Sequence, residues 1–350
     1  MGMHTLLRRW PAAVAAVLIV SNGLSAEAAP GPYALSYLGD PPGGSSWAAE
    51  AYAINGDGVV AGQFRTSADS RASSPFVSVG GTVHSLGTPL GRVHSGARGI
   101  NDLGQVVGLT HEFDLDSRSF LWQQGIGHID LGTLGGDQAR ALAINNAGTV
   151  VGSSTTAAWE GHAFAYYAGV MHDIHQLGVE TEARAISPNG TIVGNWRTAN
   201  FEERAFVFRD GVMHDVDPLH EHEHAYANGV NDAGQVVGMG MAGEDFHAAL
   251  WQDGVMHDLG ALGGRRSEAL AINAQGQIVG RSAVKGDRTW HAFVYGDGRI
   301  WALTPLVVQG GNGCKLQSAD AINTRGQITG MALCNGQRRP YLLTPIPAAP

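Results

Sequence analysis

The stretch ALAINNAGTVVG, residues 141–152, places a polar turn that ends in glycine between two short apolar runs. Asn145 begins the turn, where its side chain can accept a hydrogen bond from the backbone two residues further on. Gly148 ends the turn at a position that favours a left-handed backbone. The stretch therefore predicts a β-hairpin.

The same motif occurs seven times along the chain. Its anchoring residues are Asn55, Asn101, Asn145, Ser187, Asn231, Asn273 and Asn323. We interpret these residues as turn formers rather than ligands, and serine can fill the same role more weakly than asparagine. Self-similarity at intervals of 42 to 50 residues is typical of a repeat architecture.

A second block follows each motif, as in HAFAYYAGVMHDIHQLG (162–178) and HAALWQDGVMHDLGALGG (247–264). Each block is expected to form two strands joined by a glycine-containing turn. One repeat then consists of four strands, named A to D in chain order. Strand A ends at the anchoring residue, B contains the VVG run, C the HAF-like run and D the MHDLG run. Seven such units predict an all-β fold, a seven-bladed β-propeller of four-stranded blades.

The two ends of the repeat region complement each other. The last repeat has no strand D, whereas YALSYLG (33–39) resembles the missing HDLGTLG strand. We therefore expect this N-terminal strand to complete the last blade, beside residues 339–343. That arrangement makes strand D outermost and strand A, rich in Ala and Gly, innermost.

The first 29 residues have the pattern of a secretory signal peptide: Arg8 and Arg9, an apolar run at 11–20, and small residues around Ala28. The chain is thus divided into a signal peptide (1–29), a single seven-repeat propeller domain (30–345) and a short C-terminal tail (346–350). The apolar run is too short to span a bilayer comfortably, and no longer run follows it. We expect an exported protein, periplasmic or extracellular, with no membrane span after processing.

The chain has two cysteines, Cys314 and Cys334. Antiparallel pairing around the Asn323 turn places them within one residue of facing each other. Because an exported chain meets an oxidising compartment, we predict a disulfide that holds the hairpin of the last repeat together.

These motifs resemble the HAF repeat family, named for the triplet found here at 162–164 and 291–293. The DLGTLGG run at 130–136 and the AINAQGQIVG run at 271–280 belong to the same pattern. The resemblance covers residues 33 to about 345 and implies an extracellular repeat protein. It implies no particular activity.

Binding residues are expected on the loops between strands B and C, because these vary in length and content while the Asn turns are uniform. The aromatic residues predicted to contact a ligand there are Trp159, Trp196, Phe113, Phe246 and Trp290. Phe64 and Phe201 fall in two of the same loops. Such rings can stack on sugars or other flat apolar faces, or they can simply pack over the ends of their own blades.

The densest cluster of titratable groups is HEHEH, residues 220–224. In an extended backbone His220, His222 and His224 point the same way and offer a site for Zn²⁺ or Cu²⁺; a solvated polar loop is the alternative. No other cofactor is expected. The histidines that recur in strands C and D are interpreted as packing or backbone hydrogen-bonding groups instead.

No catalytic template is present: there is no Gly-x-Ser-x-Gly, no His-Glu-x-x-His and no phosphate loop. The formal net charge of −9 and the absence of a basic stripe argue against nucleic acid as a partner. The sequence favours a monomeric binding or interaction module whose partner is a glycan or a protein. The alternatives are a propeller-type hydrolase or lyase with carboxylate and His groups at the channel mouth, and a structural surface protein.

Overall fold

The computed structural model describes residues 30–41, 49–66, 72–112, 116–216, 224–286, 289–296 and 298–347. The predicted signal peptide lies outside these residues. Within them the regular structure consists of β-strands and two short 3-10 helices, η2 (Pro89–Gly91) and η3 (Thr304–Leu306). No helix of the described part of the chain is long and apolar enough to cross a membrane.

All seven copies of the motif form the predicted hairpin of strands A and B. In chain order the hairpins are β2 (Ala49–Ile54) with β3 (Val60–Arg65), β6 (His94–Ile100) with β7 (Val106–His111), β10 (Gly135–Ile144) with β11 (Val150–Thr156), β14 (Glu180–Ile186) with β15 (Ile192–Arg197), β18 (Ala225–Val230) with β19 (Val236–Ala242), β22 (Gly263–Ile272) with β23 (Ile278–Val284), and β27 (Cys314–Ile322) with β28 (Ile328–Cys334).

Strands C and D follow each hairpin. They are β4 (Ser73–Val79) and β5 (Thr82–Ser85), β8 (Ser117–Gln123) and β9 (Gly127–Asp130), β12 (Gly161–Tyr167) and β13 (Val170–Asp173), β16 (Glu203–Arg209) and β17 (Val212–Asp215), β20 (Asp245–Gln252) and β21 (Val255–Gly260), and β24 (Trp290–Gly296) and β25 (Arg299–Ala302). The last repeat supplies only strand C, β29 (Gln337–Pro345).

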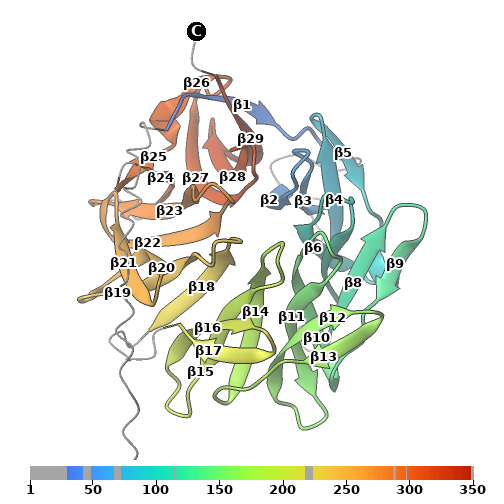
Figure 1. Ribbon diagram of the computed structural model, residues 1–350. Helices are drawn as coiled ribbons and strands as arrows, with labels where there is room; N and C mark the ends of the chain where they lie inside the picture. Colours follow the sequence, from blue (N-terminus) through green and yellow to red (C-terminus); the bar gives the residue numbers. More distant parts are fainter. Residues whose placement is uncertain are drawn as a thin grey trace, which may run out of the picture.

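Hydrogen bonds join these strands into five sheets. The third and fourth repeats each form a four-stranded sheet, while two eight-stranded sheets each contain two repeats linked by a single bridging pair, Ser73 with His94 and Phe246 with Arg266. The sheets lie around a common centre, with the A strands inside and the D strands outside (Figure 1). Strand β2 of the first repeat packs against β27 and β28 of the last.

The N-terminal strand β1 (Tyr33–Tyr37) pairs antiparallel with β29, from Tyr33 opposite Pro345 to Tyr37 opposite Tyr341. This pairing confirms that the N-terminal strand completes the last repeat. The prediction of four strands is wrong for this sheet, which has the order β26-β1-β29-β28-β27. The fifth strand, β26 (Val307–Gln309), comes from the long connection between the sixth and seventh repeats and pairs parallel with β1, whose edge would otherwise be open.

Close contact between strands A and B explains the glycine of the VVG run. Strand A bulges just before the turn, as the register shift between Ala141 and Ala143 shows. A Cβ atom on Gly152 of the facing strand would lie 1.8 Å from the carbonyl oxygen of Arg140. The equivalent glycines of the other six repeats meet a strand A carbonyl at 2.1 Å or less. Any side chain there would force the hairpin apart.

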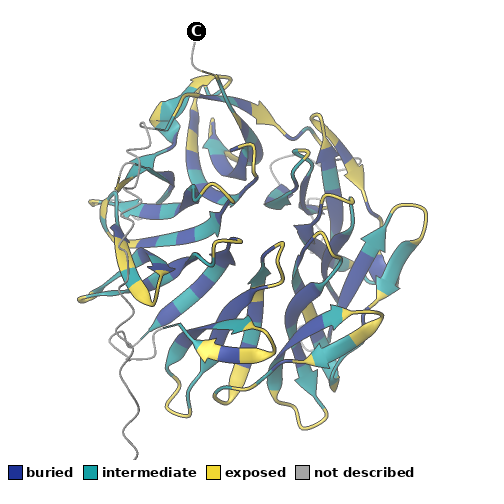
Figure 2. Cartoon of the chain, viewed as in Figure 1, coloured by how far each residue is buried: buried dark blue, intermediate teal, exposed yellow. Residues whose placement is uncertain are grey.

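The core lies between neighbouring repeats, in seven clusters of buried residues. Five of these clusters contain the aromatic residue of the HAF-like run: Phe76, Phe164, Phe206, Phe293 and Tyr341, each at most 1% exposed. Each fully buried ring contributes about 1.5–3 kcal/mol of transfer free energy. Exposed residues gather in the turns and outer strands, whereas the inner strands are buried or half-buried (Figure 2).

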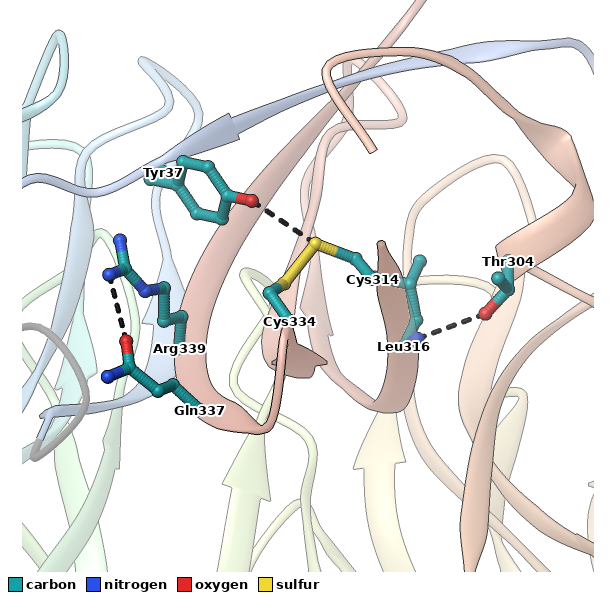
Figure 3. Close-up of a disulfide and its surroundings, with 7 residues drawn as sticks. All are labelled: Tyr37, Thr304, Cys314, Leu316, Cys334, Gln337 and Arg339. Atoms are coloured by element: carbon teal, nitrogen blue, oxygen red, sulfur yellow. Dashed lines mark hydrogen bonds between the residues drawn. A yellow bond between two sulfur atoms is a disulfide. The ribbon is translucent and has the colours of Figure 1, made fainter. Parts of the chain in front are cut away.

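The predicted disulfide is present. Cys314 and Cys334 are paired directly opposite each other in β27 and β28, with their Cα atoms 4.0 Å apart. The hydroxyl of Tyr37 lies 3.2 Å from the Cys314 sulfur, and the Arg339 guanidinium lies over the Tyr37 ring (Figure 3). The disulfide therefore sits where β1 joins the last repeat.

Candidate functional site

The turns between strands B and C share one face of the molecule with the connections from strand D to the next strand A; we call it the BC face. A cavity of about 350 Å³ opens here between the third, fourth and fifth repeats. Its lining consists of Gln138, Arg140, Ser153, Ser154, Thr155, Gly161, Glu180, Thr181, Glu182, Arg184, Asn195, Trp196, Arg197, Glu203 and Tyr226. We call this cavity the BC cleft. Its volume lies in the range of small-molecule sites.

Ion pairs organise one wall of the BC cleft. Arg197 at the end of β15 contacts Glu180 at 2.6 Å and Glu203 at 2.8 Å. The hydrogen bond that Arg197 donates to Glu203 raises the pKa of Arg197, and the negative charge of Glu203 adds to this effect. These three side chains come from the first residues of β14 and β16 and the last of β15, so the ends of three adjacent strands fix their positions.

The other charged side chains that line the BC cleft include both positive and negative groups. Arg184 pairs with Glu182 at 3.1 Å. Arg140 is exposed, and the structure shows no ion pair or hydrogen bond from its side chain to any described residue. The cleft thus contains three arginines and three glutamates, and one of the arginines has hydrogen-bonding capacity to spare.

Trp196 was expected in a loop but lies within β15, opposite Thr181 and Arg204. Its ring packs under the chain at Gly178, where a Cβ atom would lie 2.6 Å from the indole carbon Cε3. The indole Nε1 is buried and has no hydrogen-bond partner among the described residues. Buried indole N–H groups usually have a partner, and this one lacks a partner among the described residues although solvent cannot reach it.

The structure places the other predicted aromatic residues as follows. Trp159 stands on the turn after β11 with 69% of its surface exposed. Phe246 lies beneath Arg266, and Trp290 beneath Arg281, at 5.7 and 4.8 Å from guanidinium carbon to ring centroid. Trp159 and Trp196 therefore belong to the third and fourth repeats, beside the BC cleft, while the other two belong to the fifth and sixth.

Two further aromatic predictions have different outcomes. Phe113 lies outside the described residues. Phe64 was placed in a loop of the BC face, and this is wrong: it is the fifth residue of β3, 2% exposed, and packs against Phe76 in the core. Strand B is longer than predicted, and the alternation along it points this ring inward.

Of the three histidines predicted to bind metal, His220 and His222 lie outside the described residues. His224 accepts a hydrogen bond from the backbone N–H of Glu203 at 3.3 Å through Nδ1, and its ring lies 6.3 Å from that of Phe246. No group of three or more His, Cys, Asp or Glu side chains within the described residues is arranged to hold a metal ion. The metal site remains a prediction.

In the third and fifth repeats the histidine of strand C pairs with the aspartate of strand D. His162 Nδ1 lies 2.7 Å from Asp173, and His247 Nδ1 lies 3.0 Å from Asp258. The same aspartates accept backbone hydrogen bonds from the connection that follows, as Asp258 does from Gly260. In these two repeats the polar residues of the strand C and strand D motifs therefore tie the outer strand to its neighbour.

A second polar cluster faces the centre of the molecule from the A strands of the first, sixth and seventh repeats. Glu50 accepts hydrogen bonds from Tyr52 and from Gln63, the latter at 2.8 Å. The Arg98 guanidinium lies over the Tyr52 ring, 4.1 Å from its centroid. Burial raises the pKa of Tyr52 to about 12.

Asp320 is the most perturbed carboxyl group of this second cluster. Burial raises its pKa to about 6, against the opposing effects of a 2.7 Å hydrogen bond from Ser318 and the charge of Arg281. Glu268, which pairs with Arg281 at 2.8 Å, adds to the rise. Several carboxylates of the B–C turns are different because each faces a cation: Glu202 pairs with Arg204, Glu203 with Arg197, and Glu244 and Asp245 with Arg265. Glu160 lies 3.8 Å from His162.

The charged residues of the BC cleft were missed by the sequence analysis. Arg140, Glu182 and Arg184 lie in A strands, which were treated as uniform scaffold. The segment TEARAI (181–186) carries Glu182 and Arg184 at positions where other A strands also carry charges, as Glu50, Arg98 and Arg140 do, and the alternation of charged with small residues in these strands was the signal.

No protein-family model matches the sequence, and no curated protein matches it. Among solved structures, the chain is similar to the β-propeller domain of the Trilobed protease from Pyrococcus furiosus, described as having an open velcro topology. The TM-score is 0.58 at 11% identity, over 89% of this chain and 95% of that one. The likeness places this protein among the β-propellers and shows the fold alone.

A second similar structure is the acylaminoacyl peptidase of Pyrococcus horikoshii. The TM-score is 0.51 at 12% identity, over 73% of this chain. The chain spans 45% of the length of that peptidase. At this identity the similarity again concerns the fold.

Proposed function

We propose that this protein is an exported binding module of the HAF repeat type, a closed propeller of seven blades that holds its ligand at the BC cleft. Closure is supported by the pairing of β1 with β29 and by the contact of β2 with β27 and β28. Export is supported by the pattern of residues 1–29 and by the disulfide, because such bonds persist in oxidising compartments.

One observation carries the assignment of the binding site: the BC cleft is lined by polar groups whose hydrogen bonds are not all used. The indole N–H of Trp196 is buried without a partner, and Arg140 is exposed without one among the described residues. The indole nitrogen is closed off from solvent, whereas a ligand in this cleft of about 350 Å³ can accept hydrogen bonds from Arg140.

A binding screen of the purified protein against glycans and secreted proteins tests this function. Arg140→Ala, which removes an exposed side chain without breaking a contact, is expected to weaken any specific binding about tenfold or more. Arg325→Ala is the matched control, because Arg325 lies on the opposite face, beside the Asn323 turn, with a half-exposed side chain. Binding that responds equally to both substitutions, or to neither, contradicts the proposal.

A hydrolase is the second candidate function, favoured by the cluster of Glu50, Glu268 and Asp320 at the centre of the molecule. A carboxyl group with a pKa of about 6 can act as an acid or a base near neutral pH. Turnover of an ester, lactone or glycoside that disappears in Asp320→Asn, while Arg140→Ala leaves it intact, would establish this candidate in place of the first.

Export is tested separately, by expression of the full sequence in a bacterial host. The proposal predicts that the protein is recovered outside the cytoplasm with a mature N-terminus near residue 30. Recovery of the unprocessed chain in the cytoplasm, with reduced cysteines, contradicts it.

A further inference from the structure

Two turns on the BC face, in neighbouring repeats, have the same conformation. In the turn at 156–160 the N–H of Thr156 donates to the carbonyl of Glu160 at 2.9 Å, and the N–H of Trp159 donates to the carbonyl of Thr156 at 3.0 Å. In the turn at 198–202 the corresponding bonds join Thr198 with Glu202 and Phe201 with Thr198, both at 3.0 Å. The two turns share the sequence pattern Thr-x-x-aromatic-Glu.

The aromatic residue of each turn has a left-handed backbone, with φ of 66° for Trp159 and 64° for Phe201. The seven turns between strands A and B, six anchored by asparagine and one by Ser187, have the same two backbone hydrogen bonds. They hold glycine at the equivalent position, with φ from 71° to 88°. Left-handed backbone strains any residue with a Cβ atom, and bulky residues rarely adopt it. The same chain thus uses glycine wherever this turn serves folding alone.

Packing does not offset the strain, because Trp159 is 69% and Phe201 76% exposed. Of the five other non-glycine residues with positive φ, Ala168, Asp210, Asp253 and Asn335 each precede a glycine in a two-residue hairpin turn that requires this conformation, and Leu90 lies inside the short 3-10 helix η2. Trp159 and Phe201 have no such explanation. A strained backbone that presents an exposed ring indicates a function for the ring.

Both turns border the BC cleft. Thr155 and Gly161, on either side of the first turn, line it, and so do Arg197 and Glu203, on either side of the second. Trp196 supplies a third aromatic ring in the wall between them. Two exposed rings at the rim and one ring in the wall form a set of apolar faces separated by charged and amide groups.

The chemistry of this set identifies a ligand class. A sugar has C–H faces, which are attracted to the negative faces of aromatic rings, and hydroxyl edges, which need both donors and acceptors. The cleft offers arginine donors and glutamate acceptors in equal number. Each aromatic turn ends in a glutamate, Glu160 or Glu202, but Glu202 pairs with Arg204 at 3.1 Å, and the three arginines and three glutamates that line the cleft leave it without a net charge to attract an anionic ligand.

We infer that the BC cleft binds a neutral oligosaccharide, whose sugar rings stack on Trp159 and Phe201 at the rim and whose hydroxyl groups bond the arginine and glutamate groups between them. This inference rests on the proposed function, and it names the ligand class of the same site. Strain at the two turns is retained because it holds the aromatic rings over the ends of the cleft.

The test is titration of the purified protein, by calorimetry and tryptophan fluorescence, with neutral hexasaccharides: maltohexaose, cellohexaose, xylohexaose, mannohexaose and chitohexaose. Hexameric oligogalacturonate and a dodecapeptide library serve as acidic and peptide probes. At least one neutral hexasaccharide is expected to bind, and Trp159→Gly and Phe201→Gly are each expected to weaken its binding about tenfold. Leu103→Ala, on an Asn turn at the opposite face and 71% exposed in the parent, is the matched control and is expected to leave binding unchanged.

Thermal unfolding of the same variants separates binding from folding. Because glycine relieves the left-handed strain, Trp159→Gly and Phe201→Gly are expected to keep or raise the midpoint of unfolding while binding falls. The inference is overturned if no neutral hexasaccharide binds, if the glycine variants bind as the parent does, or if they unfold at lower temperature. Binding of oligogalacturonate or peptide alone that Arg140→Ala abolishes also overturns it but leaves the proposed binding function standing.

Discussion

The side-chain amide of Asn323 donates a hydrogen bond to the main-chain carbonyl of Asn55, at 3.0 Å and across 268 residues of sequence. It is one of a series in which each anchoring asparagine bonds the carbonyl of the next anchoring residue: Asn55 to Asn101, Asn101 to Asn145, Asn145 to Ser187, Asn231 to Asn273, and Asn273 to Asn323. The asparagine Oδ1 atoms meanwhile accept backbone hydrogen bonds within the turns, as Asn145 does from Ala147 and Thr149. One amide therefore closes its own turn and links two repeats.

Two substitutions of Asn323 should separate the contribution of its hydrogen bonds within the turn from that of its hydrogen bond to the next repeat. Asn323→Ser keeps an acceptor for the turn but loses the donor to Asn55, as Ser187 does naturally, and is expected to lower the free energy of unfolding by about 1–2 kcal/mol. Asn323→Ala loses both roles at a site that is 5% exposed and should cost about 2–4 kcal/mol. Urea unfolding measures both. Equal costs for the two variants would show that the link between repeats contributes nothing.

Ser187 offers the reverse experiment. Serine cannot reach the next anchoring residue, and the structure instead has Asn189 donating to the carbonyl of Asp232 at 3.1 Å. Ser187→Asn supplies the missing donor and is expected to raise the free energy of unfolding by about 0.5–1 kcal/mol. A lower free energy of unfolding for Ser187→Asn would mean that the new side chain disrupts the hydrogen bond from Asn189 to Asp232 without replacing it.

The disulfide should stabilise the last repeat chiefly by restricting the unfolded chain. Its two cysteines are 20 residues apart, a loop length for which chain-entropy arguments give about 3 kcal/mol. The double variant Cys314→Ala, Cys334→Ala is expected to lose about this much in urea unfolding, and reduction of the parent should reproduce the loss. A cost near zero would imply that the pairing of β27 with β28 already restricts the unfolded state.

Pairing of β1 with β29 should control self-association. Removal of residues 30–38 exposes the hydrogen-bonding edge of β29 along Tyr341–Thr344, and open edges recruit other strands. The shortened protein is expected to form dimers or larger species in light scattering, whereas the full protein stays monomeric. Leu35→Asp provides a variant of normal length: Leu35 is 7% exposed in the core of the last repeat, and a buried charge there should weaken the pairing without removing the strand.

The repeat fold could be predicted because its determinants are local. Asn145 and Gly148 specify a turn within four residues, and Cys314 and Cys334 follow from counting back along that kind of turn. The links between repeats could not be predicted in the same way. The partner of Asn323 is 268 residues away, and nothing within its own turn indicates that the spare N–H group points to a neighbour.

The site was less predictable than the fold for a related reason. Trp196 was placed in the loop between strands B and C, yet β15 continues through it to Arg197. Strand length depends on pairing with strand C, which local patterns do not reveal. The strain at Trp159 was also hidden, since its left-handed backbone emerges only when the hydrogen bonds of the turn are known.

Asp320 should make the free energy of unfolding fall as the pH rises from about 4 to about 6. Its pKa rises from the ordinary 3.8 to about 6 because the group is buried, so the folded protein holds this proton more tightly than the unfolded chain does. The contribution of Asp320 to the free energy of unfolding is therefore largest below about pH 4 and falls as the pH rises to about 6.

Asp320→Asn, which can still accept the hydrogen bond from Ser318, removes that loss and is expected to stabilise the protein at pH 7.5 by an amount on the order of 1–3 kcal/mol. Urea unfolding of parent and variant at pH 4 and pH 7.5 measures the difference. A variant that is less stable than the parent at pH 7.5 would show that the ionised carboxylate is held by Arg281 more strongly than burial opposes it.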